Sequence, residues 1–388
     1  MIGANLRWGV FSLLGVWLSM AGGVDVAYAD WSIRVDEDRS LSLGIAMKAE
    51  LSIQERAAPN GQDDSFDFSV TDARFYTYGH LNAKVGFQLA YAYELNETEF
   101  ESESDDEAEL RLLDAVLQYS FSDQLNVWLG RLIVPTDRNA LADQYRRAIW
   151  SAPVARGVLG RRDGRDDGVV LWGDIDGGGL KYYFGLYEGF ETSDNTEDNP
   201  LLVGRMVLNF WQPEAGYFLS SSYLGEKDVF ALGVSWSFQK EAFYNGSVEG
   251  DYWGLGVDFL IEKSLANRGV LTFETAVYDY DADNLGTLNG SNFDNRLEGD
   301  GYFAFLGYLL SSKQGPTAEG FQPMVRYHRF RFGQSEIDET IAVVDYGLSY
   351  FMSGHDSKVV LIFSDYSVEV DGQVDEYSEI KMAAQLVF

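Results

Sequence analysis

The chain has 388 residues and a formal net charge of −32 at pH 7, yet aromatic side chains make up 15% of it. Such acidity excludes a nucleic-acid-binding protein, because phosphate contacts require a basic patch, and the aromatic content excludes a disordered acidic tail. The absence of cysteine excludes disulfides, thiolate metal sites and cysteine nucleophiles, while 40 glycines beside 7 prolines are typical of a large all-β protein.

The first 29 residues are typical of a secretory signal peptide. Arg7 precedes an apolar run from Trp8 to Met20, and small residues surround a cleavage point at Ala27-Tyr28-Ala29. A single-pass membrane anchor is the less favoured alternative, because the run is shorter than the ~20 residues that a membrane-spanning helix needs. We expect cleavage near Ala29, so that residues 30–388 form one exported domain.

From Asp30 onward, apolar residues recur at every second position, which predicts β-strands because strand side chains alternate between two faces. The stretches 84–95, 230–239 and 379–388 show the pattern most clearly. In the last stretch every residue on one face is apolar, namely Ile380, Met382, Ala384, Leu386 and Phe388. Apolar outward faces with small or polar inward faces are typical of a barrel that spans a lipid bilayer.

Comparable runs predict sixteen strands, at 41–54, 66–80, 83–96, 110–121, 124–134, 167–176, 179–190, 201–211, 229–239, 251–263, 268–281, 299–311, 321–333, 341–352, 357–368 and 376–388. Short and long connections alternate along the chain, as a barrel with both ends on the periplasmic side requires. Residues 212–228 are the exception, because they form a long link where a short turn is expected, and Tyr217, Leu219, Ser221 and Tyr223 alternate as a further strand would. The predicted fold is therefore all-β, a transmembrane antiparallel β-barrel of about sixteen strands, to within two. A soluble β-sandwich or propeller is the alternative.

One connection, residues 97–109, is strongly acidic and contains no basic residue. Its carboxylates are Glu97, Glu99, Glu101, Glu103, Asp105, Asp106, Glu107 and Glu109. We interpret it as a solvated external loop. The alternative is a divalent-cation bridge to lipopolysaccharide phosphates, because hard cations prefer oxygen ligands.

Arginines concentrate in the connection 135–166 and at its entry. They are Arg131, Arg138, Arg146, Arg147, Arg156, Arg161, Arg162 and Arg165, against only Asp137, Asp143 and Asp163 within the same limits. Fixed positive charge on a loop folded into a barrel lumen would favour passing anions, and guanidinium groups bind oxyanions well. The alternative is that these arginines pair with the acidic barrel wall and hold the loop in place. Both roles remain open for different arginines.

From Leu129 to Gly189 the chain resembles the phosphate-selective porin O and P family. The resemblance lies in Leu129–Pro135, Arg138, Leu141, Arg165–Val169 and Tyr183–Gly189, with later matches at Tyr223–Asp228 and Val325–Tyr327. It implies a homotrimeric, sixteen-stranded porin of the bacterial outer membrane, in contact with lipid and lipopolysaccharide, with an inward-folded third external loop. The terminal Phe388 resembles the mark that the barrel-assembly machinery reads in such proteins. The dense lysine ladder of the phosphate-specific members is absent, so phosphate specificity is not implied.

The predicted function is passive diffusion of small, anionic hydrophilic solutes through an outer-membrane channel, with the eight arginines at its constriction. An enzyme is not expected, because His80, His328 and His355 are accompanied by no nucleophile or zinc motif. No cofactor or metal is expected. The alternatives are a non-conducting structural or scaffolding barrel and a secreted β-rich carbohydrate-binding protein.

Overall fold

The computed structural model describes residues 31–36, 38–94, 109–157, 159, 164–190, 198–244, 249–282, 296–333 and 339–388. The expected signal peptide, nearly all of the acidic connection, and both Arg161 and Arg162 lie outside the described residues.

The described residues form seventeen strands and very little helix. The strands are β1 (Trp31–Arg34), β2 (Ser40–Gln54), β3 (Ser65–Asn82), β4 (Val85–Glu94), β5 (Glu109–Ser122), β6 (Leu125–Ile133), β7 (Arg165–Ile175), β8 (Leu180–Tyr187), β9 (Leu201–Asn209), β10 (Val229–Tyr244), β11 (Glu249–Ser264), β12 (Gly269–Ala282), β13 (Gly299–Lys313), β14 (Glu319–Phe332), β15 (Glu339–Ser353), β16 (Ser357–Val370) and β17 (Gln373–Val387). The helical elements are α1 (Arg138–Leu141) and the 3₁₀ turns η1 (Asp176–Gly178) and η2 (Gly315–Thr317). Within this part of the chain, no helix has both the length and the apolar character needed to cross a membrane.

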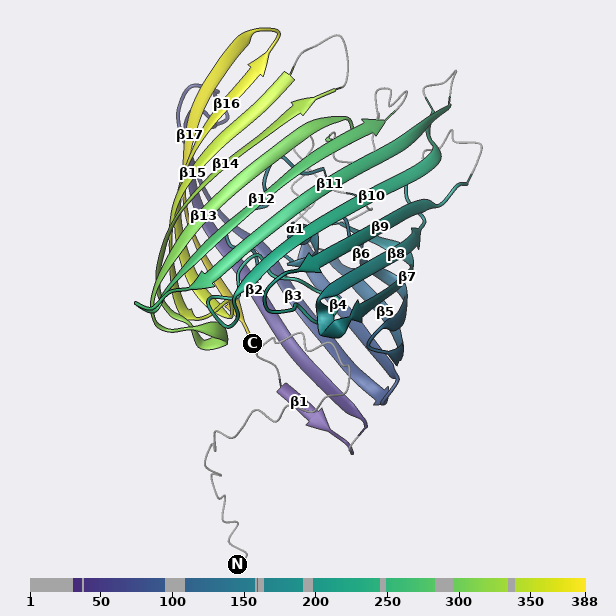
Figure 1. Ribbon diagram of the computed structural model, residues 1–388. Helices are drawn as coiled ribbons and strands as arrows, with labels where there is room; N and C mark the ends of the chain where they lie inside the picture. Colours follow the sequence, from purple (N-terminus) through teal and green to yellow (C-terminus); the bar gives the residue numbers. More distant parts are fainter. Residues whose placement is uncertain are drawn as a thin grey trace, which may run out of the picture.

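Sixteen strands close into a barrel, which confirms the predicted fold class and strand number. Each strand from β2 to β17 pairs antiparallel with the next, and β17 closes the ring by pairing with β2. Figure 1 shows the strands running obliquely around the barrel, with β1 projecting below its rim. The strand β1 is additional to the ring and pairs only with Ser40–Leu43 at the start of β2.

The strand β1 and the end of the chain share one edge of β2. Ile45 and Phe388 exchange two backbone hydrogen bonds, at 2.7 Å and 2.6 Å, directly beyond the residues of β2 that β1 covers. Along this edge of β2, backbone pairing with β1 is therefore followed almost at once by backbone pairing with the C-terminal residues and β17.

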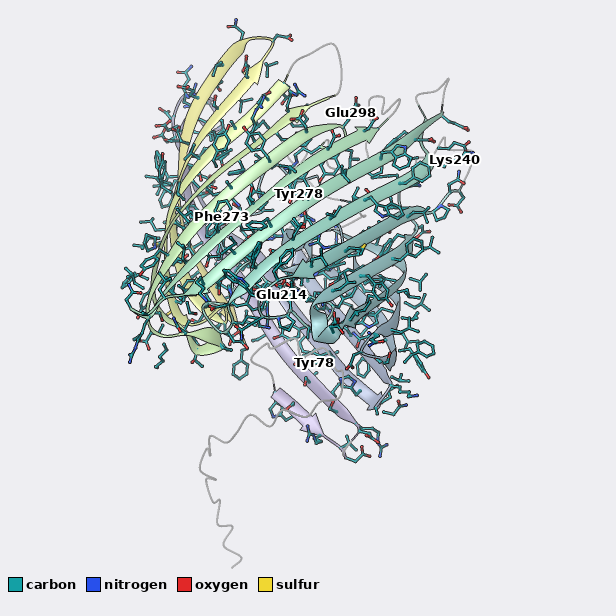
Figure 2. The ribbon with its side chains drawn as sticks, viewed as in Figure 1. Tyr78, Glu214, Lys240, Phe273, Tyr278 and Glu298 are labelled. Carbon is teal, nitrogen blue, oxygen red and sulfur yellow. The ribbon has the colours of Figure 1, made fainter. Side chains whose placement is uncertain are left out.

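Alternation places apolar side chains outward and polar ones inward, as the sequence predicts. On β17, Met382 is 52% exposed and Leu386 50%, whereas Gln385 between them is 3% exposed. Figure 2 labels Phe273 and Tyr278 on β12, which lie on the outward and the inward face respectively. A continuous apolar exterior is favourable only in apolar surroundings, and a closed ring leaves no strand edge unpaired within them.

The two ends of the barrel differ in their connections. One end, here the short-turn end, carries the tight links 83–84, 123–124, 176–179, 265–268, 314–318 and 354–356, and both β1 and the C-terminus lie there (Figure 1). The opposite end, the long-connection end, carries the links 95–108, 134–164 and 283–298. This matches the predicted alternation, with two exceptions: residues 210–228 are a long link at the short-turn end, and residues 371–372 are a tight turn at the long-connection end.

Residues 210–228 are not a strand but an irregular segment folded into the barrel, here called the inner segment. Tyr217 is fully buried and stacks on Trp128 of the wall, with ring centroids 4.4 Å apart. On its other side the inner segment meets the connection 134–164, where the Leu219 amide donates to the Leu141 carbonyl at 3.1 Å. The alternating residues 217–223 resemble a strand in sequence because the inner segment is buried on two sides, by the barrel wall and by the connection 134–164.

Candidate functional site

The described residues of the connection 134–164, here called the lumen loop, lie inside the ring and contact inward-facing side chains on several strands. Three of these form one row across neighbouring strands: Lys358 on β16, Gln385 on β17 and Lys48 on β2. They donate to three loop carbonyls, those of Arg147 at 3.3 Å, Tyr145 at 2.9 Å and Trp150 at 3.0 Å respectively. The row therefore fastens the middle of the lumen loop to the wall where the barrel closes.

A second attachment joins the lumen loop to β14. Arg326 donates to the Ser151 carbonyl at 2.7 Å, and the Val154 amide donates to Nδ1 of His328 at 2.8 Å. Because Nδ1 accepts, Nε2 must carry the hydrogen that bonds the Asp345 carboxylate at 2.9 Å. Both ring nitrogens of His328 are thus occupied, and the side chain is only 3% exposed. This arrangement suits attachment of the loop and not proton transfer to a solute.

The third attachment is a buried ion pair between the lumen loop and the inner segment. Nη1 and Nη2 of Arg138 in α1 lie 2.6 and 2.7 Å from the two carboxylate oxygens of Glu214, and Nη1 also donates to the Ser220 carbonyl. Burial alone would lower the pKa of Arg138, but the Glu214 carboxylate outweighs burial and raises it. Burial likewise opposes ionisation of Glu214, yet Arg138 holds the pKa of that carboxyl below its ordinary value. Both groups are therefore charged, and Nε of Arg138 also lies 3.8 Å from Oδ1 of Asp258 on β11.

Two further arginines predicted at the constriction are also paired. Arg156 is 3% exposed, with Nε 2.7 Å from Oδ2 of Asp137. Arg165 is equally buried, with Nε 2.9 Å from Oδ1 of Asp114. Arg156 therefore pairs within the lumen loop, whereas Arg165 begins β7, pairs with β5 and meets the loop only at Asp143, with Nη2 3.8 Å from Oδ2.

Arg131 lies elsewhere, because it belongs to β6 and not to the connection. It shares the outward face with Leu129, which is 55% exposed, whereas Trp128 on the inward face is 1% exposed. It forms a two-pronged pair with Asp167 directly across on β7, at 2.8 and 2.7 Å. Its charge therefore lies on the face of the strand opposite to the lumen.

Arg146 and Arg147 are the partly exposed arginines among the described residues of the lumen loop. Arg146 lines a cavity at the short-turn end together with His355 and Asp356. Burial raises the pKa of the Asp356 carboxyl to about 6, although the charge of Arg146 opposes the rise. Burial, reinforced by the charges of Lys358 and Arg146, lowers the pKa of His355 to about 3. His355 is therefore neutral near pH 7, and Arg146 shares this cavity with the carboxyl groups of Asp356 and Glu226.

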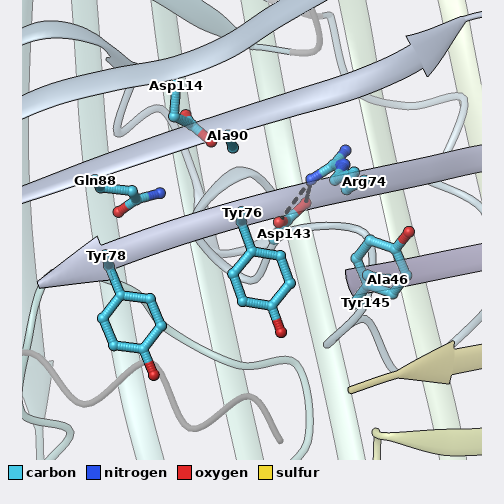
Figure 3. Close-up of a pocket in the computed structure, with 9 residues that line it drawn as sticks. All are labelled: Ala46, Arg74, Tyr76, Tyr78, Gln88, Ala90, Asp114, Asp143 and Tyr145. Carbon is cyan, nitrogen blue, oxygen red and sulfur yellow. Dashed lines mark hydrogen bonds and ion pairs between the residues drawn. The ribbon is translucent and has the colours of Figure 1, made fainter. Parts of the chain in front are cut away.

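A cavity lies beside β3, β4 and β5, where three inward-facing residues of β4 are small: Gly86, Ala90 and Ala92. Figure 3 shows a cavity here, lined by Ala46, Arg74, Tyr76, Tyr78, Gln88, Ala90, Asp114, Asp143 and Tyr145, and we call it the tyrosine pocket. Arg74 pairs with Asp143 of the lumen loop, with Nη1 2.9 Å from Oδ2. The tyrosine pocket is therefore bounded by the barrel wall on one side and the lumen loop on the other.

Sequence reasoning missed Arg74, Lys48, Lys358 and Glu214. The first three lie at inward-facing positions of strands in which apolar and polar residues alternate. Their place in that alternation could therefore have identified them as lumen-facing. Glu214 carried no signal, because it lies in the irregular inner segment.

The fold is similar to those of solved outer-membrane proteins. The anion-selective porin from Comamonas acidovorans has a TM-score of 0.57 and 13% identity, over 90% of this chain and 100% of that one. The outer membrane channel DcaP of Acinetobacter baumannii gives 0.59 and 10%, over 92% and 99%. The trimer form of OmpT, an outer membrane protein of Vibrio cholerae, gives 0.53 and 12%, over 91% and 100%. No family model and no curated protein sequence matches the chain, so membership in the O and P family stays a prediction.

Proposed function

We propose that this chain is an outer-membrane porin, a passive channel for small hydrophilic solutes that favours anions. The observation that carries the proposal is a closed barrel with an apolar exterior and a polar interior, in which small side chains on β4 leave the tyrosine pocket beside the lumen loop. The fold shared with porins and channels supports it. Diffusion through such a passage requires no catalytic residue.

The preference for anions rests on Arg146 and Arg147, the partly exposed arginines in the described part of the lumen loop. Lys48 and Lys358 are buried and bond loop carbonyls instead. Arg138, Arg156 and Arg165 each face a carboxylate at 2.6–2.9 Å. A guanidinium that reaches the lumen attracts anions.

Replacing Arg146 and Arg147 together by Gln is expected to lower the anion-to-cation permeability ratio while leaving the barrel folded. A unit charge ~4 Å from an ion contributes about 1 kcal/mol even in bulk water, and more in a narrow lumen. A loss of about 1 kcal/mol corresponds to roughly a fivefold change in the ratio. Reversal potentials across planar bilayers under a salt gradient measure it.

The matched control is the double variant Arg329→Gln and Arg331→Gln, which removes two arginines from the outward-facing side of β14. Its permeability ratio should equal that of the unmodified protein. A ratio unchanged in the Arg146 and Arg147 variant would end the claim that these two residues set selectivity. A ratio that already favours cations in the unmodified protein would remove anion preference and keep the channel.

A non-conducting structural barrel is the second candidate, and a specific observation favours it. The lumen loop and the inner segment together place many side chains in the interior, and Tyr217, Leu141 and Ala155 among them are fully buried. Complete absence of conductance from folded protein would support this candidate.

The proposal includes export, assembly and oligomeric state. We propose signal cleavage near Ala29, residence of residues 30–388 in the outer membrane among lipid and lipopolysaccharide, and a homotrimer. The solved OmpT trimer and the similar fold support the last two. Anion-selective members of the O and P family are the relatives that we expect.

Deleting Phe388 is expected to impair assembly strongly, although it removes one residue and no charge. Phe388 is 63% exposed on the outer face, so it contributes little to the interior, yet it makes two backbone hydrogen bonds to Ile45 at the closing seam. If the side chain is an assembly mark, Phe388→Ala should be impaired as well, although it keeps both backbone bonds. Heat-modifiable gel mobility of cell-envelope protein measures assembly, and normal mobility of Phe388→Ala would contradict the role of the ring.

A further inference from the structure

On the side of the barrel formed by β2 to β5, the described inward-facing side chains are more exposed near both ends than in the middle. On β3, Ser69 and Tyr78 are half-buried, whereas Asp72, Arg74 and Tyr76 between them are at most 7% exposed. The same pattern recurs on β5, where half-buried residues stand on either side of buried ones: Arg111, then Asp114 and Val116, then Gln118. Solvent therefore reaches this side of the lumen from both ends, and a thin buried layer separates the two parts.

The loop side of this buried layer is a strap of three residues, Asp143–Tyr145, in the lumen loop. Nη1 of Arg74 donates to both carboxylate oxygens of Asp143, at 2.9 and 3.1 Å (Figure 3). The side chains of Gln144 and Tyr145 both donate to the Asp72 carboxylate. Nε of Arg74 also donates to Asp72, at 2.9 Å. Two neighbouring inward side chains of β3 thus hold all three residues of the strap.

The strap closes this side of the lumen, because the wall beside it is built of very small residues. Gly44 and Ala46 on β2 and Ala90 and Ala92 on β4 face inward here, and none has a side chain larger than a methyl group. The tyrosine pocket between strap and wall has a volume of about 30 Å³, which holds water and is too small for an organic solute. Passage beside these strands therefore requires the strap to move.

The strap is held by charge, and Asp143 contributes that charge. Burial opposes ionisation of Asp143, but Arg74 and Arg165 hold the pKa of its carboxyl below the ordinary value, so the group is charged. If Asp143 were neutral, Arg74 would keep its pair with Asp72 at 2.9 Å, and Arg165 its pair with Asp114 at 2.9 Å. Neutralising Asp143 would therefore free the strap without leaving either guanidinium alone in the buried layer.

We propose that the strap is the gate of the channel, closed in this conformation and opened when Asp143 leaves Arg74; this rests on the proposed channel function. Asp143 has a φ of +50°, in the left-handed region that costs a residue with a side chain free energy, so release relieves its backbone. The movement is local, because the Leu219 amide bonds the last carbonyl of α1 and Gln385 bonds the Tyr145 carbonyl. Opening joins the two solvent-reached parts of the lumen.

The test measures release of the strap in the full folded chain in nanodiscs, without any need for conductance. The chain contains no cysteine, so Ala90→Cys places a single thiol on the wall of the tyrosine pocket, and a membrane-impermeant maleimide with mass spectrometry reports its exposure. Adding Asp143→Asn, which keeps the size and removes the charge, should raise the labelling rate at least about tenfold, the effect of one lost charged hydrogen bond. Single-channel recordings of Asp143→Asn should show a larger open fraction.

Asp114→Asn is the matched control, because it removes the same charge from the same layer and leaves the bonds of the strap in place. It should label the Ala90→Cys thiol no faster than the chain without it, and heat-modifiable gel mobility confirms that each variant is folded. Equal labelling with and without Asp143→Asn would overturn the proposal. So would equal acceleration by Asp114→Asn, or an Ala90→Cys thiol that already reacts as fast as one at the half-buried Gln118.

The two measurements separate failure of the gate from failure of the channel. If the protein conducts and Asp143→Asn changes neither labelling nor open fraction, the gate fails and the channel stands. If Asp143→Asn accelerates labelling and neither chain conducts, the channel fails, and the strap closes an interior that solutes do not cross.

Discussion

Replacing Arg138 by Met is expected to destabilise the protein by about 3–5 kcal/mol, the cost of leaving one partner of a buried ion pair alone. Glu214 would then be a charge with 1% exposure whose guanidinium partner is gone, and Tyr223 would remain as a hydroxyl donor to it. The loss removes the pair that joins the lumen loop to the inner segment. Urea unfolding of the protein inserted in lipid vesicles measures the free energy of unfolding, and bilayer recordings should show noisier conductance.

Two further variants distinguish this from a general effect of losing arginine. Arg131→Met removes a guanidinium whose side chain is 31% exposed beside Asp167, and pairs of that kind contribute only about 0–1 kcal/mol. Adding Glu214→Leu to Arg138→Met should recover part of the loss, because the uncompensated charge is then removed. Equal stability of Arg138→Met and the unmodified protein would show that the pair does not hold the two segments together.

Removing the inner segment is expected to raise single-channel conductance several-fold, because it clears one end of a water-filled lumen whose conductance scales with its open cross-section. The backbone pairing between β9 and β10 continues as far as Gln212, whose amide donates to the Asp228 carbonyl at 3.1 Å. Residues 213–227 can therefore be replaced by an Asn-Gly turn. Arg138→Met accompanies the change, since the Glu214 carboxylate is deleted.

Arg138→Met alone is the reference for this experiment, because it shares the lost pair and keeps the inner segment. The shortened variant should conduct more than this reference. Equal conductance of the two would place the narrowest point elsewhere, beside the tyrosine pocket. A shortened variant that conducts when the unmodified protein does not would identify the inner segment as the closure of a structural barrel.

The barrel could be predicted from the sequence because every strand must place apolar side chains outward and may place polar ones inward. A residue such as Leu386 faces outward while Gln385 faces inward, and this two-residue period survives across the chain. The positions of the turns follow from the same period. The predicted strand ends differ from the observed ones by at most five residues, the largest difference being at the end of β10, predicted at 239 and observed at Tyr244.

The candidate site was less predictable, because its partners are distant in sequence. The Arg138 and Glu214 pair joins positions 76 residues apart, and the Tyr145 carbonyl and Gln385 are 240 apart. Composition indicated that arginines collect near the lumen loop, but it could not assign a carboxylate to each. Arg131 was grouped with the loop because of its position in the chain, although the parity of β6 places it outward.

The row of Lys358, Gln385 and Lys48 also constrains the order in which the molecule assembles. These side chains lie on β16, β17 and β2, the strands that flank the closing seam, so an open sheet cannot present all three to the lumen loop. The row therefore forms only after the first and last strands of the ring have met, and bringing such distant residues together is slow. This attachment of the lumen loop is thus the last to form. An unclosed intermediate would hold the loop only by its contacts with β14 and the inner segment, so a protease should cut residues 145–150 more readily before closure than after it.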